Sequence, residues 1–182
     1  STNIVLILAF TAIPQAAHAA SISLFPSGGS FAPGQTFSVS ININTNEPVN
    51  AAEVTLTFPA DKLQATGIGG GTFDINAEST IGSGIVRISR GKLPPSVVGS
   101  AKVASVSFKA LTAGKATLSA SGQALRESDS VNVLSGGAGA TFNIAGAAVK
   151  TTPGQGFTLL KITNIRLSDL ATEAATITWK TD

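Results

Sequence analysis

Carboxylate side chains are the groups in this sequence that could perform acid–base chemistry. Glu127 and Asp129 lie two residues apart, so on a β-strand they would share a face. Asp74 and Glu78 flank a short segment that follows a glycine-rich stretch. A glycosidase needs two carboxyl groups roughly 5 to 10 Å apart, one of them with a raised pKa. We favour the plainer interpretation of both pairs, in which they are solvated acids on loops.

Oxygen ligands for calcium are available in the same segment. Asp74, Asn76 and Glu78 alternate along the chain, but the dense acidic spacing of a calcium-binding loop is missing. These three residues are therefore the candidate calcium ligands. No other metal or cofactor is predicted.

Histidine and cysteine chemistry is excluded by composition. The single histidine, His18, lies in the apolar N-terminal segment, and cysteine is absent. The rest of the chain therefore cannot assemble a Ser-His-Asp or Cys-His site, a His-ligated metal centre or a disulfide. We predict that the protein is not an enzyme.

Aromatic residues are few, which bears on sugar binding, because carbohydrate-binding surfaces usually present aromatic rings. Tyrosine is absent, and the one tryptophan falls near the C-terminal end. Phe73 is the one phenylalanine on a glycine-rich loop (GGGTFDIN), and it is the candidate for an exposed stacking residue. Four other phenylalanines lie on apolar strand faces and are predicted to be core: Phe37, Phe58, Phe108 and Phe142.

The segment RISRGKLPP carries three bases, Arg87, Arg90 and Lys92, beside two prolines. They could form the rim of a protein-binding face. The interpretation we favour is a solvated sheet edge whose charges discourage strand pairing. Elsewhere the bases are scattered singly and the net charge is only +2, so nucleic acid is not a predicted partner. GIGGG (residues 67–71) lacks the elements of a phosphate loop, and we interpret it as a loop or bulge.

A two-residue periodicity dominates from Ile22 onward. Apolar and polar residues alternate, or strand-forming residues cluster, over residues 21–25, 37–44, 54–58, 85–89, 104–110, 116–120, 131–134 and 140–144. Glycine and proline turn signals separate these runs, at residues 26–30, 32–35, 45–48, 67–71, 82–84, 112–115 and 135–139. The pattern predicts an all-β fold, an antiparallel β-sandwich of about nine strands.

The stretch VTLTFPADKLQATGI (residues 54–68) is a strand interrupted by Pro59. Proline has no N–H to donate, so it ends the ladder. We expect Leu56 and Phe58 to face the core, and the turn after Pro59 to return Leu63 to it.

Four segments are predicted along the chain. Residues 1–19 contain an apolar run and an A-x-A motif that ends at Ala19, which is typical of a cleaved signal peptide; the alternative is a short apolar helix that is retained as a membrane anchor. Residues 20–144 form the β-sandwich domain, 145–159 a linker, and 160–182 the truncated start of a second β-sandwich. We expect the chain to be cut at both ends. We also expect an exported protein, secreted or at the cell surface.

The segment 21–144 resembles a cohesin-like domain, a β-sandwich of the type also found in carbohydrate-binding modules. Five stretches follow the order of that family: FAPGQTFSVSININT, NAAEVTLTFPADKLQATGI, IVRISRG, VASVSFKALTAGKATLSAS and ATFNI. The resemblance implies a nine-stranded jelly-roll sandwich. It also implies a protein partner, because the best-known members bind dockerin modules or anchor surface assemblies. The positions that contact dockerins are not motif residues, so no site residue is carried over.

The C-terminal stretch ITNIRLSDLATEAATITWKTD resembles the first two strands of a fibronectin type III domain, with Trp179 at the position of that family's core tryptophan.

Together these features predict a non-catalytic, exported module that binds a protein, either a dockerin-like module or another surface protein. Its candidate binding residues are Phe73, Arg87, Arg90 and Lys92. Two alternatives are a carbohydrate-binding module of a polysaccharide-degrading protein, and a subunit of a surface filament or layer that retains residues 1–19.

Overall fold

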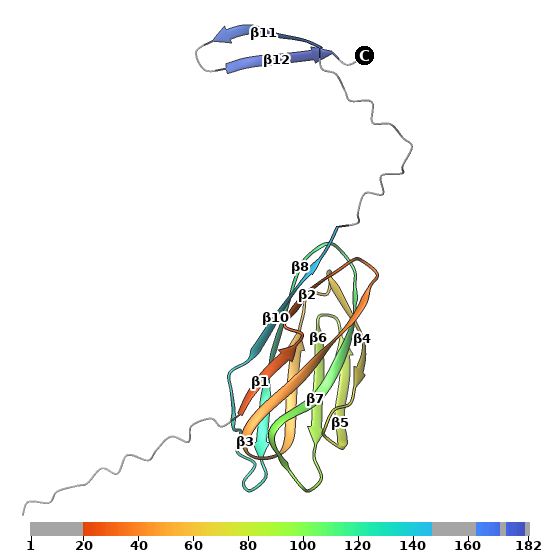
Figure 1. Ribbon diagram of the computed structural model, residues 1–182, viewed down its shortest axis with the longest axis vertical. Coiled ribbons are helices and arrows are strands. Elements are labelled where there is room, and N and C mark those ends of the chain that lie inside the picture. Colours follow the sequence, from red (N-terminus) through yellow and green to blue (C-terminus); the bar gives the residue numbers. More distant parts are fainter. Residues whose placement is uncertain (1–19, 147–162, 172–173, 181–182) are drawn as a thin grey trace, which may run out of the picture. The chain divides into compact units, whose positions relative to one another are not determined.

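The computed structural model describes residues 20–146, and the backbone of residues 163–171 and 174–180 (Figure 1). Within these ranges every regular element is a β-strand, which confirms the all-β prediction. None of the described residues belongs to a helix long and apolar enough to span a membrane. The predicted N-terminal segment, residues 1–19, lies outside the described residues. The chain divides into two units, with the boundary between Ala148 and Val149.

The described residues of the first unit, 20–146, form ten strands. In chain order they are β1 (Ala20–Phe25), β2 (Gly28–Phe31), β3 (Thr36–Thr57), β4 (Leu63–Gly69), β5 (Ile75–Gly82), β6 (Ile85–Gly91), β7 (Val97–Ala110), β8 (Gly114–Arg126), β9 (Leu134–Ser135) and β10 (Ala138–Ile144).

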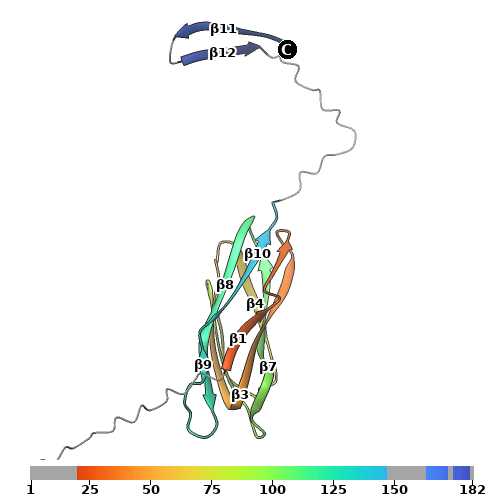
Figure 2. The ribbon, with the colours of Figure 1, turned by 60° about the vertical axis from the view of Figure 1, so that its left-hand side comes forward.

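The long strand β3 belongs to both layers of the sandwich. Its first half, residues 36–45, pairs with β1 on one side and β7 on the other. Its second half, residues 49–57, pairs with β6 and β8. We call β9-β1-β3-β7-β4 the first layer and β5-β6-β3-β8-β10-β2 the second layer. The strands that pair within each layer run side by side in Figure 1 and Figure 2.

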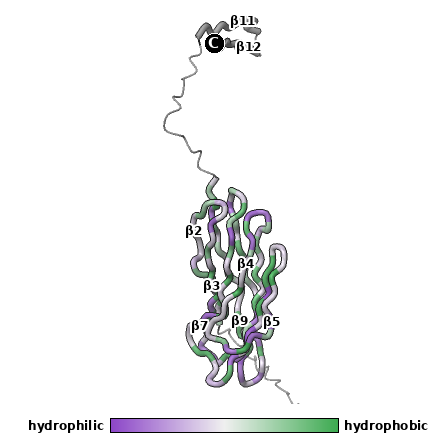
Figure 3. The backbone as a smooth tube through the Cα atoms, turned by 90° about the vertical axis from the view of Figure 1, so that its right-hand side faces the viewer, coloured by the Kyte–Doolittle hydropathy of each residue, from purple (hydrophilic) through white to green (hydrophobic). Residues whose placement is uncertain are grey.

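The core lies between the two layers, because the inward residues of each strand are apolar and the outward ones are polar. Figure 3 shows how hydrophobic and hydrophilic residues succeed each other along the strands of the first unit. Four of its phenylalanine rings meet in succession. Phe31 stacks on Phe37 with ring centroids 4.0 Å apart, Phe37 and Phe108 are 5.7 Å apart, and Phe58 meets the edge of Phe108 at 5.2 Å. The predicted core positions Phe58, Phe108 and Phe142 are buried, and Phe37 packs half-buried against them.

The interrupted strand at Pro59 has the predicted geometry. Leu56 and Phe58 are buried, and β3 ends at Thr57. The carbonyl of Pro59 accepts hydrogen bonds from the N–H groups of Lys62 and Leu63 at 3.1 and 3.0 Å, which closes a turn. That turn returns Leu63 to the core, where it is 1% exposed.

The predicted turns at residues 45–48 and 26–30 have different outcomes. Residues 45–48 are part of strand β3, yet the chain reverses there, as predicted, where β3 passes from one layer to the other (Figure 1). Both ends of β3 therefore lie beside the end of β7, so that Phe108 contacts both Phe37 and Phe58. The buried Thr45 side chain holds this reversal: its hydroxyl donates to the Glu47 carbonyl at 2.8 Å and accepts from the Glu47 N–H at 3.1 Å. The predicted turn at residues 26–30 is wrong, because these residues contain the start of β2, which pairs in parallel with β10.

The second unit is described only as a two-stranded antiparallel hairpin, β11 (Thr163–Ala171) and β12 (Ala174–Lys180). The backbone thus confirms that strand structure resumes after residue 160, as the alternation of that stretch predicts.

Candidate binding surfaces

Pairing of β5 with β6 brings most of the candidate residues together. Asn76 lies opposite Arg90, and Thr80 opposite Arg87. The prediction of a loop is wrong for residues 75–78, which belong to strand β5, whereas Asp74 lies on the loop that precedes it. The prediction that the bases mark a sheet edge is also wrong: β6 is paired on both sides, by β3 and β5, and β5 is the edge.

Asp74 and Lys92 form an ion pair where the chain enters β5 and leaves β6. Lys92 Nζ donates to Asp74 Oδ2 at 2.6 Å, and the Leu93 N–H donates to the same oxygen at 3.2 Å. The hydrogen bond from Lys92 holds the pKa of the Asp74 carboxyl below its ordinary value. Asp74 therefore connects the loop before β5 to the loop after β6, and its negative charge is already paired with Lys92.

Arg90 points into the sandwich, on the same face of β6 as Val86 and Ile88, and is 5% exposed. Its guanidinium donates to Asn76 Oδ1 and to the Glu78 carbonyl oxygen, the latter at 3.1 Å. Among the described residues it forms no salt bridge. Burial lowers the pKa of Arg90 from its ordinary value, since the charge loses water without gaining a carboxylate.

These contacts bear directly on the calcium candidates. The oxygen of Asn76 accepts hydrogen bonds from Arg90 and from the Ser79 hydroxyl, the latter at 2.8 Å. Asp74 is bound to Lys92, and the Glu78 side chain is exposed. The side chains of Arg90 and Lys92 thus already bind the oxygens of Asn76 and Asp74. The described part of the chain contains no group of three or more histidine, cysteine, aspartate or glutamate side chains that could hold a metal ion.

Phe73 is not exposed, contrary to the expectation from its glycine-rich loop. Its side chain is 6% exposed and belongs to the core, so it offers no ring to a ligand. The exposed ring is Phe25, at 71%, on the outward face of β1. The alternation of residues 21–25 indicates this exposure: Phe25 falls on the same face of the strand as Ser21 and Ser23, opposite to the face of the buried Ile22 and Leu24.

The carboxylate pair near the end of β8 has no catalytic arrangement. Glu127 and Asp129 lie in a turn, so they do not share a strand face. Asp129 is bound by Arg126 through two hydrogen bonds, of 2.9 and 2.8 Å, and Arg126 also binds Glu47. The bond from Arg126 lowers the pKa of Asp129, and the two carboxylates raise that of Arg126. A carboxyl group that acts as a general acid needs a raised pKa, whereas the pKa of Asp129 is lowered.

The outer face of the second layer carries charges of both signs. Arg87 lies between Thr55 of β3 and Thr80 of β5, and the next row of the ladder carries Glu53 and Glu78. This surface is shallow, with a hollow of about 240 Å³. Arg87 is exposed and forms no salt bridge within the described ranges. Its guanidinium is therefore free to bind a carboxylate of another molecule.

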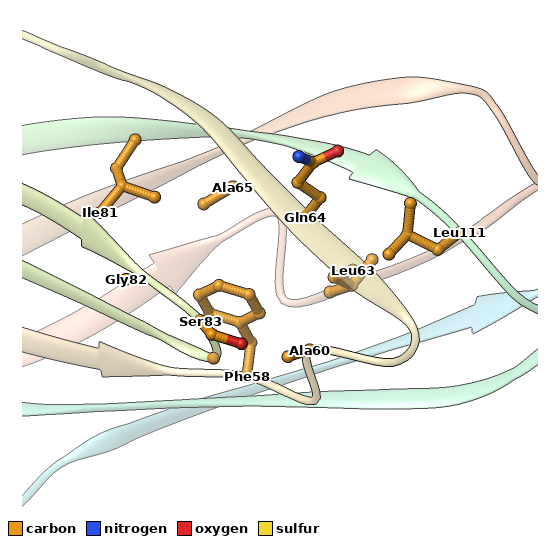
Figure 4. Close-up of a pocket in the computed structure, with 10 residues that line it drawn as sticks. Phe58, Ala60, Leu63, Gln64, Ala65, Ile81, Gly82, Ser83 and Leu111 are labelled. Atoms are coloured by element: carbon orange, nitrogen blue, oxygen red, sulfur yellow. The ribbon is translucent and has the colours of Figure 1, made fainter.

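A separate pocket opens at the seam between β4 and β5, the edge strands of the two layers (Figure 4). It has a volume of about 460 Å³, and its floor is apolar, with Phe58, Leu63 and Leu111. Ile81 of β5 stands at its side and is 41% exposed. No charged side chain lines the pocket, so it could bind a ligand through apolar contacts but supplies no acid, base or charged group.

Three features of these surfaces were not predicted from the sequence. They are the strand β5, the burial of Arg90 and the exposure of Phe25. All residues of β5 are exposed, so it lacks the alternation by which a strand is recognised.

No family model and no curated protein matches the chain, but many solved structures share its fold. The cohesin module of a family 33 glycoside hydrolase from Clostridium perfringens has a TM-score of 0.60 at 13% identity, over 70% of this chain and 98% of that one. A non-cellulosomal cohesin of the archaeon Archaeoglobus fulgidus gives 0.59 at 14%, over 70% and 91%. The sixth cohesin of scaffoldin B from Acetivibrio cellulolyticus, solved with a Cel5 dockerin, gives 0.58 at 14%, over 70% and 99%. At these identities the likeness establishes a cohesin-like fold.

Proposed function

We propose that residues 20–144 form a non-catalytic, exported module that binds a partner protein through the outer face of its second layer. The observation that carries the proposal is the exposed Arg87, which forms no salt bridge within the described residues and lies on a face with charges of both signs. Such mixed charges give a protein interface its specificity and orientation, because each must meet its opposite in the partner.

The fold supports a partner of the dockerin class. A cohesin of the same fold, from Acetivibrio cellulolyticus, is solved as a complex with a dockerin. The lack of a catalytic arrangement agrees with a binding role: the composition excludes histidine and cysteine sites after residue 19, and Asp74 and Asp129 are held in ion pairs.

The remaining segments complete the proposal. Residues 1–19 act as an export signal, residues 145–159 as a linker, and the hairpin β11–β12 begins a fibronectin type III domain. If residues 1–19 are retained, the module is instead a subunit of a surface filament or layer. Mass spectrometry of the secreted protein separates the two, because a chain that begins at Ala20 contradicts retention.

The binding proposal is tested by calorimetric titration with a panel of dockerin modules. Arg87→Glu should weaken binding at least about tenfold, or roughly 1.4 kcal/mol, because it places a like charge against the partner. Lys109→Glu makes the same charge change on the outer face of the first layer, and should leave the affinity unchanged.

Two results would overturn the proposal. One is that none of the dockerin modules binds the wild-type protein. The other is that Arg87→Glu binds as tightly as the wild type, which would place the interface elsewhere.

A further inference from the structure

The outer face of the first layer differs from that of the second in charge. The outward positions of β1, of the first half of β3, of β4 and of β7 from Ser100 to Lys109 include no carboxylate. They carry Ser, Thr, Asn and Gln, one aromatic ring and two lysines, Lys102 and Lys109. Both lysines are exposed, and neither forms a salt bridge within the described ranges.

Phe25 provides the apolar area of this face. In the antiparallel ladder it lies directly opposite Ser40 of β3, and Ser40 in turn lies opposite Ser105 of β7. Directly opposed residues share a face of the sheet, so the ring stands at one end of a row of hydroxyl groups. Small side chains beside the ring leave its surface open, and Phe25 is 71% exposed.

The neighbouring rows add donors and acceptors of hydrogen bonds. Ser23, Asn42 and Lys102 form the row on one side of Phe25. On the other side Ser38 and Ser107 lie opposite each other, with their hydroxyl oxygens 3.0 Å apart. With strands about 4.8 Å apart and residues about 3.4 Å apart along a strand, Lys102 lies roughly 12 Å from Phe25 and Lys109 roughly 17 Å.

We propose that this face binds an acidic polysaccharide, with Phe25 packed against a sugar ring and Lys102 and Lys109 bound to its carboxylates. Each component of the ligand matches a component of the face. The apolar side of a pyranose ring suits an exposed aromatic ring, and sugar hydroxyls suit serine and asparagine side chains. Ammonium groups form charge-assisted hydrogen bonds with uronic acid carboxylates.

The charge pattern argues against other polyanions. Nucleic acid requires a series of cations that follow a phosphate backbone, and here the two lysines lie six rungs apart in the ladder of β3 and β7. A protein partner with acidic side chains would find few apolar anchors, since Phe25 and Val98 are the large exposed apolar side chains of β1, β3, β4 and β7. An oligosaccharide, by contrast, is long enough to reach from the ring to the lysines.

This site is independent of the protein-binding face, because the two lie on the outer surfaces of different layers. One module could therefore hold a partner protein while it binds a polysaccharide of the cell surface or its surroundings. The sequence offers carbohydrate binding as an alternative with Phe73 as the stacking residue, and the structure transfers that role to Phe25.

The test is affinity electrophoresis of the purified chain through gels that contain polygalacturonate, alginate or the neutral glucan dextran. The wild-type protein should be retarded by at least one acidic polymer and not by dextran. Phe25→Ala should reduce the retardation at least about tenfold in apparent affinity, and Lys102→Glu with Lys109→Glu should abolish it. Retardation of the wild type should also weaken when salt is raised, because the lysines act through charge.

Lys115→Glu is the matched control, since it reverses one exposed cation on the outer face of the other layer. The acidic polymers should retard it as strongly as the wild type, when the mobility of each protein is compared with its own mobility in a gel without polymer. Phe25 is exposed, so its truncation leaves the core intact, and circular dichroism verifies the fold of each variant. The proposal is overturned if neither acidic polymer retards the wild type, if dextran retards it equally, or if Phe25→Ala binds like the wild type.

Discussion

At the scale of single residues, Arg90 is the clearest case of a charge used for structure. Arg90 occupies a position on β6 that faces the core, where an apolar residue is expected. Its guanidinium donates hydrogen bonds to the Asn76 side chain and to the Glu78 carbonyl of the edge strand β5. β5 buries none of its residues, so these bonds add to the ladder that holds it against β6. The arginine thus ties an exposed edge strand to the sandwich.

Arg90→Ala should lower the free energy of unfolding by about 1–3 kcal/mol, because it removes the hydrogen bonds from Arg90 to Asn76 and Glu78 and the packing of its buried side chain. Arg87→Ala removes the same side chain from the outer face of the same strand, and should change stability by less than about 0.5 kcal/mol. Urea unfolding monitored by circular dichroism measures both. Equal midpoints for the two variants would show that the Arg90 hydrogen bonds contribute nothing.

At the scale of elements, the strands that alternate were predictable and the others were not. β1, the two halves of β3, β7, β8 and β10 each bury one face, so their period of two appears in the sequence. The chain reversal at residues 45–48 was predictable because Asn and Pro favour turns, although pairing of the residues before and after it makes β3 a continuous strand. The candidate site was predicted less accurately than the strands. Arg90 and Phe73 were expected to be exposed, and their burial depends on neighbours that are distant in the sequence.

Close backbone approach between β3 and β8 is the element-level feature with the sharpest consequence. A Cβ atom on Gly122 would lie 1.9 Å from the carbonyl oxygen of Glu53, so β8 can pass β3 here only without a side chain. Gly122→Ala should destabilise the domain by about 1–3 kcal/mol through this clash. Gly139 of β10 is the matched control: a Cβ there meets Leu118 O at 3.7 Å, an ordinary contact. Thermal unfolding compares the two, and equal loss in both would contradict the clash.

At the scale of the whole molecule, the domain is held by its core and has few ionic contacts. The charged fraction is only 12%, and the described residues contain four salt bridges, three of them in the Arg126 and Lys92 clusters. Charge is distributed unevenly over the surface, with lysines alone on the first layer and both signs on the second. The fold therefore depends on apolar burial, and most charges are left for recognition or solubility.

Acid should destabilise the domain through the paired carboxylates. The pKa of Asp129 is lower in the folded protein than its ordinary value near 3.8, so the folded state binds fewer protons than the unfolded chain. The stabilisation is complete above the unfolded pKa and is lost as pH falls through the folded value. Asp129→Asn should therefore have a lower Tm than the wild type at pH 6, with the two curves converging below about pH 4.

Glu127→Gln makes the same charge change two residues away, at a side chain without a salt bridge among the described residues. Its Tm should follow that of the wild type from pH 6 to pH 2. A constant gap between Asp129→Asn and the wild type over that range would show that the pair with Arg126 carries no linked proton.

The continuity of β3 through both layers has a kinetic consequence. Its two halves pair with β1, β6, β7 and β8. In the ladders with β7 and β8, and in most of the ladder with β6, the paired residues are 30 or more positions apart in the sequence. Neither layer can be completed until this strand is in place, so no half-sandwich should accumulate as a stable intermediate. We expect a single cooperative transition with slow refolding, since the pairing of distant segments must precede most of the apolar burial.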